Sequence, residues 1–172
     1  MSNARAVLWV IRIWLVAALL IGASGRLASI RPPLPVVVLF ALTIAAITAA
    51  LLVPRFRGWA DSVDLRVLVG FHIVRFVGIY FILLYQRGQL PYAFAVPGGI
   101  GDIVVAAIAV LLLANKQTPA ISRMFFWWNL LGLADILFVV ATAGRLAMAD
   151  PDSMGAMLRL PLSLLPTWLV PL

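Results

Sequence analysis

The chain has 172 residues, of which 65% are hydrophobic and 11% are charged, and its mean hydropathy is +1.12. A soluble domain carries about 25% charged residues, so this composition indicates a membrane protein, with room for five or six helices of roughly 20 residues each. The absence of cysteine from the sequence excludes thiolate catalysis, cysteine-ligated metals, iron–sulfur clusters and disulfides. The net charge of +7 comes from basic residues scattered among short loops, which favours contact with anionic lipid head groups over nucleic-acid binding.

Two apolar runs open the chain. The run 6–25 contains Arg12 within about two turns of its start, where a long side chain is expected to snorkel towards the membrane surface. Its basic start and small final residues resemble a signal peptide, but its length favours a retained helix. A proline-rich link then ends this helix, and the second span, residues 34–53, has no ionisable residue.

The third span, residues 66–86, carries a charged face. His72, Arg75 and Gly78 are spaced three apart, so they lie on one side of a helix. A glycine on this side would let another backbone or a ligand approach the arginine.

The fourth span is predicted to be interrupted. A helix over residues 103–114 is only about 18 Å long, too short for a hydrocarbon core of about 30 Å. The missing length must come from residues 92–102, where Pro97, Gly98, Gly99 and Gly101 break an apolar stretch. We therefore expect re-entrant or partly unwound backbone leading into a half-helix, a feature that often marks a binding site in transporters.

Two interpretations of this glycine-rich segment are open. In the favoured one, the glycines permit a bend and Asp102 caps the helix that follows. In the other, glycine amides are presented to an anion, as at other helix N-termini. The segment lacks the lysine and hydroxyl of a P-loop, and Asp102 would repel phosphate.

The fifth span, residues 124–144, contains Asn129 and Asp135, and Trp128 and Gly132 share a face with Asp135. The last residues, 158–172, are apolar but punctuated by three prolines. They predict a kinked partial sixth span, an interfacial segment or the start of a truncated helix.

Charged residues inside the apolar runs are the main clue to function. Arg75 needs a charged or polar partner at depth, and only Asp102 and Asp135 offer carboxylates there, so we expect a pair with one of them. Such a pair either fixes helix packing or belongs to a polar cavity that binds an anion or passes protons. His72, the single histidine, is expected to be a packing residue rather than a ligand of haem or a metal.

Three segments together resemble a group of small multi-pass bacterial membrane proteins of unknown function. The segments are RGQLPYAFAVPGGIGD (residues 87–102), Trp128-Asn129-x-x-Gly132-x-x-Asp135 and LPLSLLPTWLVPL at the end of the chain. The resemblance covers the chain from about residue 70 onwards and implies a bacterial membrane location, but no activity. Members of the group continue into a further apolar helix, which implies here either a truncated chain or a helix supplied by a partner.

The sequence therefore predicts an all-α integral membrane bundle forming a single domain over residues 1–172. It has five full spans, the fourth of them Gly/Pro-interrupted, and a proline-rich partial sixth. We expect a non-enzymatic module of the bacterial inner membrane that binds or transports a small solute or ion, without a metal or cofactor. The residues expected to form its site are Arg75, Asp102, Asp135, Asn129, His72, Gly99 and Gly101. The alternatives are a non-catalytic subunit or assembly factor of a larger membrane complex, and an anchor that binds haem or quinone. The expected partners are the lipid bilayer and a membrane protein or a second copy of the chain.

Overall fold

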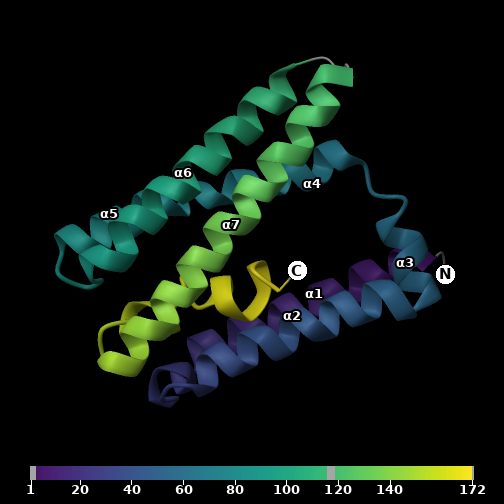
Figure 1. Cartoon of the computed structure of the whole chain (residues 1–172). Coiled ribbons are helices and arrows are strands. Elements are labelled where there is room, and N and C mark those ends of the chain that lie inside the picture. The colour runs from purple at the N-terminus through teal and green to yellow at the C-terminus, as the bar shows by residue number, and fades with distance from the viewer. Residues whose placement is uncertain (1–2, 116–118, 172) are drawn as a thin grey trace. The chain divides into compact units, whose positions relative to one another are not determined.

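A computed structural model describes residues 3–115 and 119–171, and every regular element in these residues is helical (Figure 1). The α-helices are α1 (Asn3–Ala23), α2 (Leu34–Leu52), α3 (Pro54–Ala60), α4 (Leu65–Phe71), α5 (Gly78–Gln86), α6 (Tyr92–Ala114) and α7 (Pro119–Ala149). Shorter helical turns are η1 (Arg26–Ser29), η2 (His72–Val77), η3 (Gly155–Leu158) and η4 (Leu165–Leu169).

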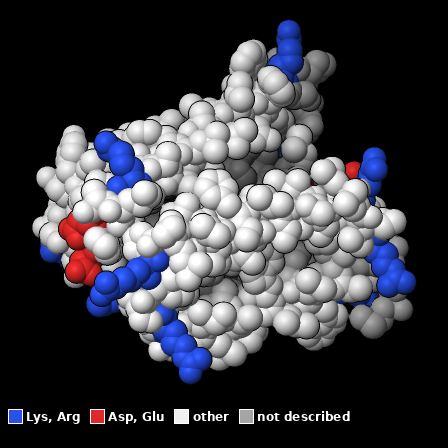
Figure 2. All heavy atoms as spheres, turned by 60° about the horizontal axis from the view of Figure 1, so that its bottom comes forward, with Lys and Arg blue, Asp and Glu red and all other residues white. Residues whose placement is uncertain are grey.

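Five stretches of the described chain are long and apolar enough to cross a membrane, as predicted. They are Arg5–Ala23, Leu34–Leu52, Leu65–Gln86, Tyr92–Ala114 and Arg123–Ala149. The proline-rich end of the chain forms only the short turns η3 and η4. Most of the face drawn in Figure 2 is uncharged, and acidic and basic side chains lie next to each other at its left edge.

The chain divides into two compact units. The first unit joins the part of the chain before Asp64 to the part after Leu146. In it, α3 packs against both α1 and α2, and η4 contacts the same two helices. The indole of Trp14 donates a hydrogen bond of 2.9 Å to the carbonyl of Thr167, so the proline-rich end lies against α1.

The second unit, Asp64–Leu146, places α6 along α4, η2 and α5, with α7 running obliquely across (Figure 1). An apolar core joins α4, α6 and α7. It consists of Val69, Val105, Ala109, Leu112, Phe125 and Trp128. Arg66, at the start of α4, donates to the carbonyls of Leu113 and Asn115 and so satisfies the free end of α6.

The prediction of an interrupted fourth span is wrong. α6 is one continuous helix with Pro97 inside it, and its 23 residues span about 34 Å without any unwound segment. A proline removes only one helical hydrogen bond, and apolar helices tolerate it where neighbouring helices support the backbone. Gly98 and Gly99 are buried in this helix, so they serve the approach of neighbouring elements rather than a bend.

The irregular backbone lies instead in the third span. The α-helix ends at Phe71, six residues follow as the 3₁₀ segment η2, and α-helix resumes at Gly78. Side chains three apart are eclipsed in a 3₁₀ helix, whereas they are rotated by about 60° in an α-helix. The segment therefore lines up His72, Arg75 and Gly78 as a straight row on one side of the span.

Candidate functional site

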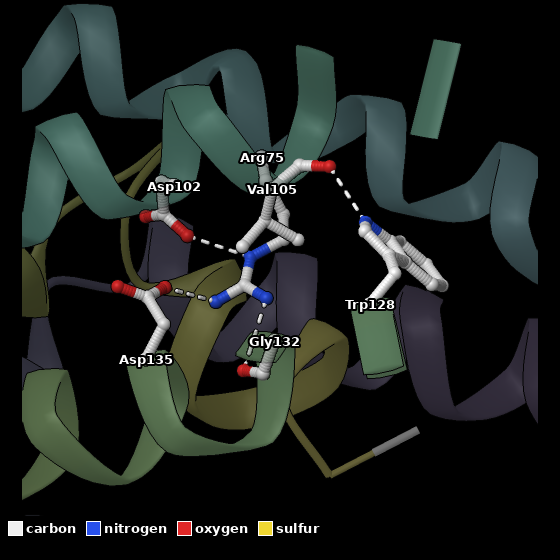
Figure 3. A network of polar contacts seen from close by, with 6 residues as sticks. All are labelled: Arg75, Asp102, Val105, Trp128, Gly132 and Asp135. Atoms are coloured by element: carbon white, nitrogen blue, oxygen red, sulfur yellow. Dashed lines mark hydrogen bonds and ion pairs between the residues drawn. The ribbon is translucent and has the colours of Figure 1, made fainter. Parts of the chain in front are cut away.

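Arg75 lies at the middle of a buried network of charges that we call the Arg75 centre (Figure 3). Its Nε donates to Asp102 Oδ1 at 2.7 Å, and its Nη2 donates to Asp135 Oδ2 at 2.6 Å. Its Nη1 donates to the carbonyl of Gly132 at 3.2 Å. The predicted pairing of Arg75 with a carboxylate is therefore present, and it involves both carboxylates rather than one.

Three elements of the second unit build this centre. Arg75 comes from η2, Asp102 from the middle of α6, and Asp135 from the middle of α7. The three side chains are only 9–10% exposed. Charge-assisted hydrogen bonds of this length are strong, and they offset part of the cost of removing ionisable groups from water. The predicted role of Asp102 as a helix cap is wrong, because this residue lies within α6 and not at its start.

Glycines make the room that the centre needs. A Cβ placed on Gly99 would lie 2.6 Å from the carbonyl oxygen of Gly78, and one on Gly101 would collide with the carboxylate of Asp135. A Cβ on Gly132 would lie 3.2 Å from Nη1 of Arg75. Gly99 and Gly101 thus lie beside the Arg75 centre, but neither interpretation of their role holds. Both lie inside a continuous helix, where their amides are engaged along the helix, and both permit close approach.

The predicted approach of another backbone beside Gly78 is confirmed, since α6 contacts the third span at Gly99. Gly78 is one end of the straight row formed with Arg75, and His72 is the other end. The His72 ring packs on the Trp128 indole with 4.8 Å between ring centroids. The same indole donates 2.9 Å to the carbonyl of Val105, which ties α7 to α6. This contact agrees with the packing role expected for His72.

Asn129 does not join the centre. Trp128, Gly132 and Asp135 share one face of α7 as predicted, but Asn129 is turned about 100° from Trp128 and is exposed. Within the described part of the chain, no hydrogen bond connects its amide to Arg75 or to either carboxylate. The position of Asn129 within the apolar run did not show which way its side chain faces, because adjacent residues of a helix face different directions.

The centre contains two acidic groups and one basic group. Its spare carboxylate oxygens would repel an anion, and the single guanidinium already binds three acceptors. With both acids ionised the centre would carry a net charge of −1, which disfavours an anion as its ligand.

In the residues that the structure describes, the fold is helical throughout its regular elements, with five potential membrane spans and a charged centre among the last three of them. Residues 32–172 match the family described as Domain of unknown function (DUF8737), and the chain belongs to this family. All residues of the Arg75 centre lie within the matched segment, whereas α1 precedes it. No curated protein and no solved structure matches the chain.

Proposed function

We propose that this protein is an integral membrane module that binds a small ion or solute at the Arg75 centre and moves it across the bilayer. The observation that carries the proposal is a buried, charged network built by three apolar helical spans. Intramembrane ionisable residues are costly, and they commonly mark ion pathways and proton relays. The resemblance to small bacterial membrane proteins favours the bacterial inner membrane as the location.

The position of the centre along α7 supports this function. Arg123 and Arg145 are exposed on this helix, and they are about 18 Å and about 15 Å along it from Asp135. A hydrocarbon core of about 30 Å fits between these two arginines. The centre would then lie near the bilayer midplane, where transporters bind their substrates.

The 3₁₀ segment supplies a moving part for the proposed transport. Binding sites of transporters often use a helix that is discontinuous at the site, and η2 is such a discontinuity. If its six residues became α-helical, the segment would shorten by about 3 Å and rotate its ends by about 120° relative to each other. Arg75 lies inside this segment, so the change would separate it from at least one carboxylate.

Ion flux tests the proposal. The wild-type protein, reconstituted in proteoliposomes, is expected to carry protons or monovalent cations down an imposed gradient. Arg75→Gln and Asp135→Asn are expected to reduce this flux at least tenfold. Matched controls are Arg145→Gln and Asp61→Asn, which change exposed residues outside the centre. The transport function is wrong if wild-type flux equals that of empty liposomes, or if all four variants carry ions at the wild-type rate.

A second candidate function is that of a subunit in a larger membrane complex, and Asn129 favours it. Its exposed amide lies about 9 Å along α7 from Asp135, inside the proposed hydrocarbon region. Amides in lipid commonly bond to a neighbouring helix. A native mass spectrum of the gently solubilised protein should then show a bound polypeptide that Asn129→Leu removes. A spectrum of the bare chain with lipid alone would count against this function.

A further inference from the structure

Asp102 and Asp135 bind the same edge of the Arg75 guanidinium. The two donors involved are Nε and Nη2, at 2.7 Å and 2.6 Å from their acceptor oxygens. In a guanidinium, these two groups point their hydrogens in nearly the same direction, and together they normally hold both oxygens of one carboxylate. Here each donor holds an oxygen of a different acid, so two separate carboxyl groups are brought side by side (Figure 3).

The backbone holds the carboxyl groups in this arrangement. The Asp135 carboxylate lies against Gly101, the residue that precedes Asp102 in α6, and it occupies the space of the missing Cβ. Asp135 thus reaches α6 directly, next to the acid that α6 itself carries. Two carboxylates this close, in a site that is about nine-tenths buried, repel each other strongly if both are ionised.

Within the described residues of the unit, neither acid forms an ion pair with a second cation, and Arg66 of the third span is bound to the end of α6. On the third span, His72 is turned against Trp128, and the phenols of Tyr80 and Tyr85 make no hydrogen bond to either acid. On α7, Arg123 and Arg145 are exposed and lie far along the helix. Arg75 alone therefore balances the two acids, and its third bond goes to the Gly132 carbonyl, which adds no positive charge.

We infer that Asp102 and Asp135 share one exchangeable proton, and that this proton is the ion bound by the Arg75 centre. The centre is then electrically neutral, with one guanidinium, one carboxylate and one carboxylic acid. Release transfers the proton from the carboxyl oxygen to water and leaves a net charge of −1, and uptake reverses this. The inference rests on the proposed function for its meaning in transport, but the bound proton itself does not depend on transport.

Infrared spectroscopy of the purified protein at neutral pH tests this inference. Wild-type protein is expected to show the C=O stretch of one protonated carboxylic acid, with a shift on exchange into D₂O. Asp102→Asn and Asp135→Asn are each expected to abolish this band, because either variant leaves one carboxylate neutralised by Arg75. His72→Gln and Asp61→Asn are matched controls that should keep it. The inference is overturned if the wild type lacks the band, or if the band survives in both Asp→Asn variants.

A second measurement needs no variant and so does not depend on their folding. The chain contains only six acidic residues, all of them aspartates. Protein labelled with ¹³C at the aspartate Cγ should give one signal at the position of a carboxylic acid, or two averaged signals, at neutral pH. Six signals of ionised carboxylates would overturn the inference. A protonated acid without flux of protons or monovalent cations would instead retain the inference and reject the transport function, and flux through two ionised acids would do the reverse.

Discussion

The two units use similar apolar helices in opposite ways. In the first unit α2 has no ionisable residue and buries only Leu39, and Arg12 of α1 is exposed with its guanidinium 5.6 Å from the centre of the Trp9 ring. In the second unit α6 buries nine residues, among them glycines and Asp102. Hydrophobic composition therefore does not distinguish a helix that is mostly exposed from one that helps to build a buried centre. The two kinds of helix are distinguished by buried small residues next to a buried charge, which α6 has and α2 lacks.

The bonds between elements differ in the same way. In the first unit, indoles of Trp14 and Trp168 donate to backbone carbonyls of Thr167 and Ile11, at 2.9 Å and 3.3 Å. Neutral bonds of this kind contribute about 0.5–1.5 kcal/mol each. In the second unit the bonds of Arg75 are charge-assisted, and each partner is costly to leave alone in a buried site.

The largest expected effect is the removal of the guanidinium. Arg75→Leu should lower the free energy of unfolding in detergent by about 3–5 kcal/mol, because it leaves Asp102 and Asp135 buried without a counter-charge. Adding Asp102→Asn and Asp135→Asn to this variant should recover a large part of the loss. Arg145→Leu, at an exposed position, should change stability by less than about 0.5 kcal/mol. Equal stabilities of the Arg75→Leu and Arg145→Leu proteins would contradict the structure of the centre.

The next effect tests the contact between backbones. Gly99→Val should cost about 1–3 kcal/mol, since its side chain would meet the carbonyl of Gly78, which cannot rotate away. Gly58→Val is the matched control in the first unit, where no atom lies within 4 Å of an added Cβ. Chemical denaturation of the two variants should therefore differ clearly. A neutral Gly99→Val would mean that α6 and the third span do not approach as closely as the structure shows.

These residues also show what the sequence predicts and what it does not. The bounds of α2 were predicted to within a residue, because an uninterrupted apolar run between prolines leaves one solution. Arg75, Asp102 and Asp135 were found because a charge in an apolar run needs a partner at similar depth. The sequence alone does not show how closely two helices approach each other. The glycines near Pro97 therefore predict an interruption of the fourth span, whereas in the structure they form a packing surface.

The α-helix that is interrupted is the third span, at η2, and the sequence of this segment contains no proline that would predict the interruption. Along this segment His72 contacts Trp128, Arg75 pairs with the two acids, and Gly78 lies against Gly99. Similarly, that both acids share one edge of the guanidinium depends on atomic positions that no spacing rule contains. The position of Asn129 has a different origin, because helical periodicity turns it about 100° away from Trp128 and the centre.

A smaller effect is expected for a neutral bond within the second unit. Trp128→Phe removes the donor to the Val105 carbonyl while keeping an aromatic ring against His72, so it should cost about 1 kcal/mol. The adjacent Trp127 is 65% exposed, and Trp127→Phe should change stability by less than about 0.5 kcal/mol. Urea unfolding in micelles would separate the two. A larger loss of stability for Trp127→Phe than for Trp128→Phe would contradict the burial of Trp128 in the core.

The smallest effect is expected from an arginine in the first unit, and it sharpens the comparison most directly. Arg12→Gln and Arg75→Gln make the same chemical change in two apolar helices. Arg12 is exposed and only stacks on Trp9, a contact worth about 0.5–1 kcal/mol at a surface, so its loss should cost no more than this. Arg75→Gln should cost several times as much, because glutamine carries no positive charge to balance the buried acidic pair. Equal losses in unfolding free energy would contradict the difference in burial between the exposed Arg12 and the buried Arg75.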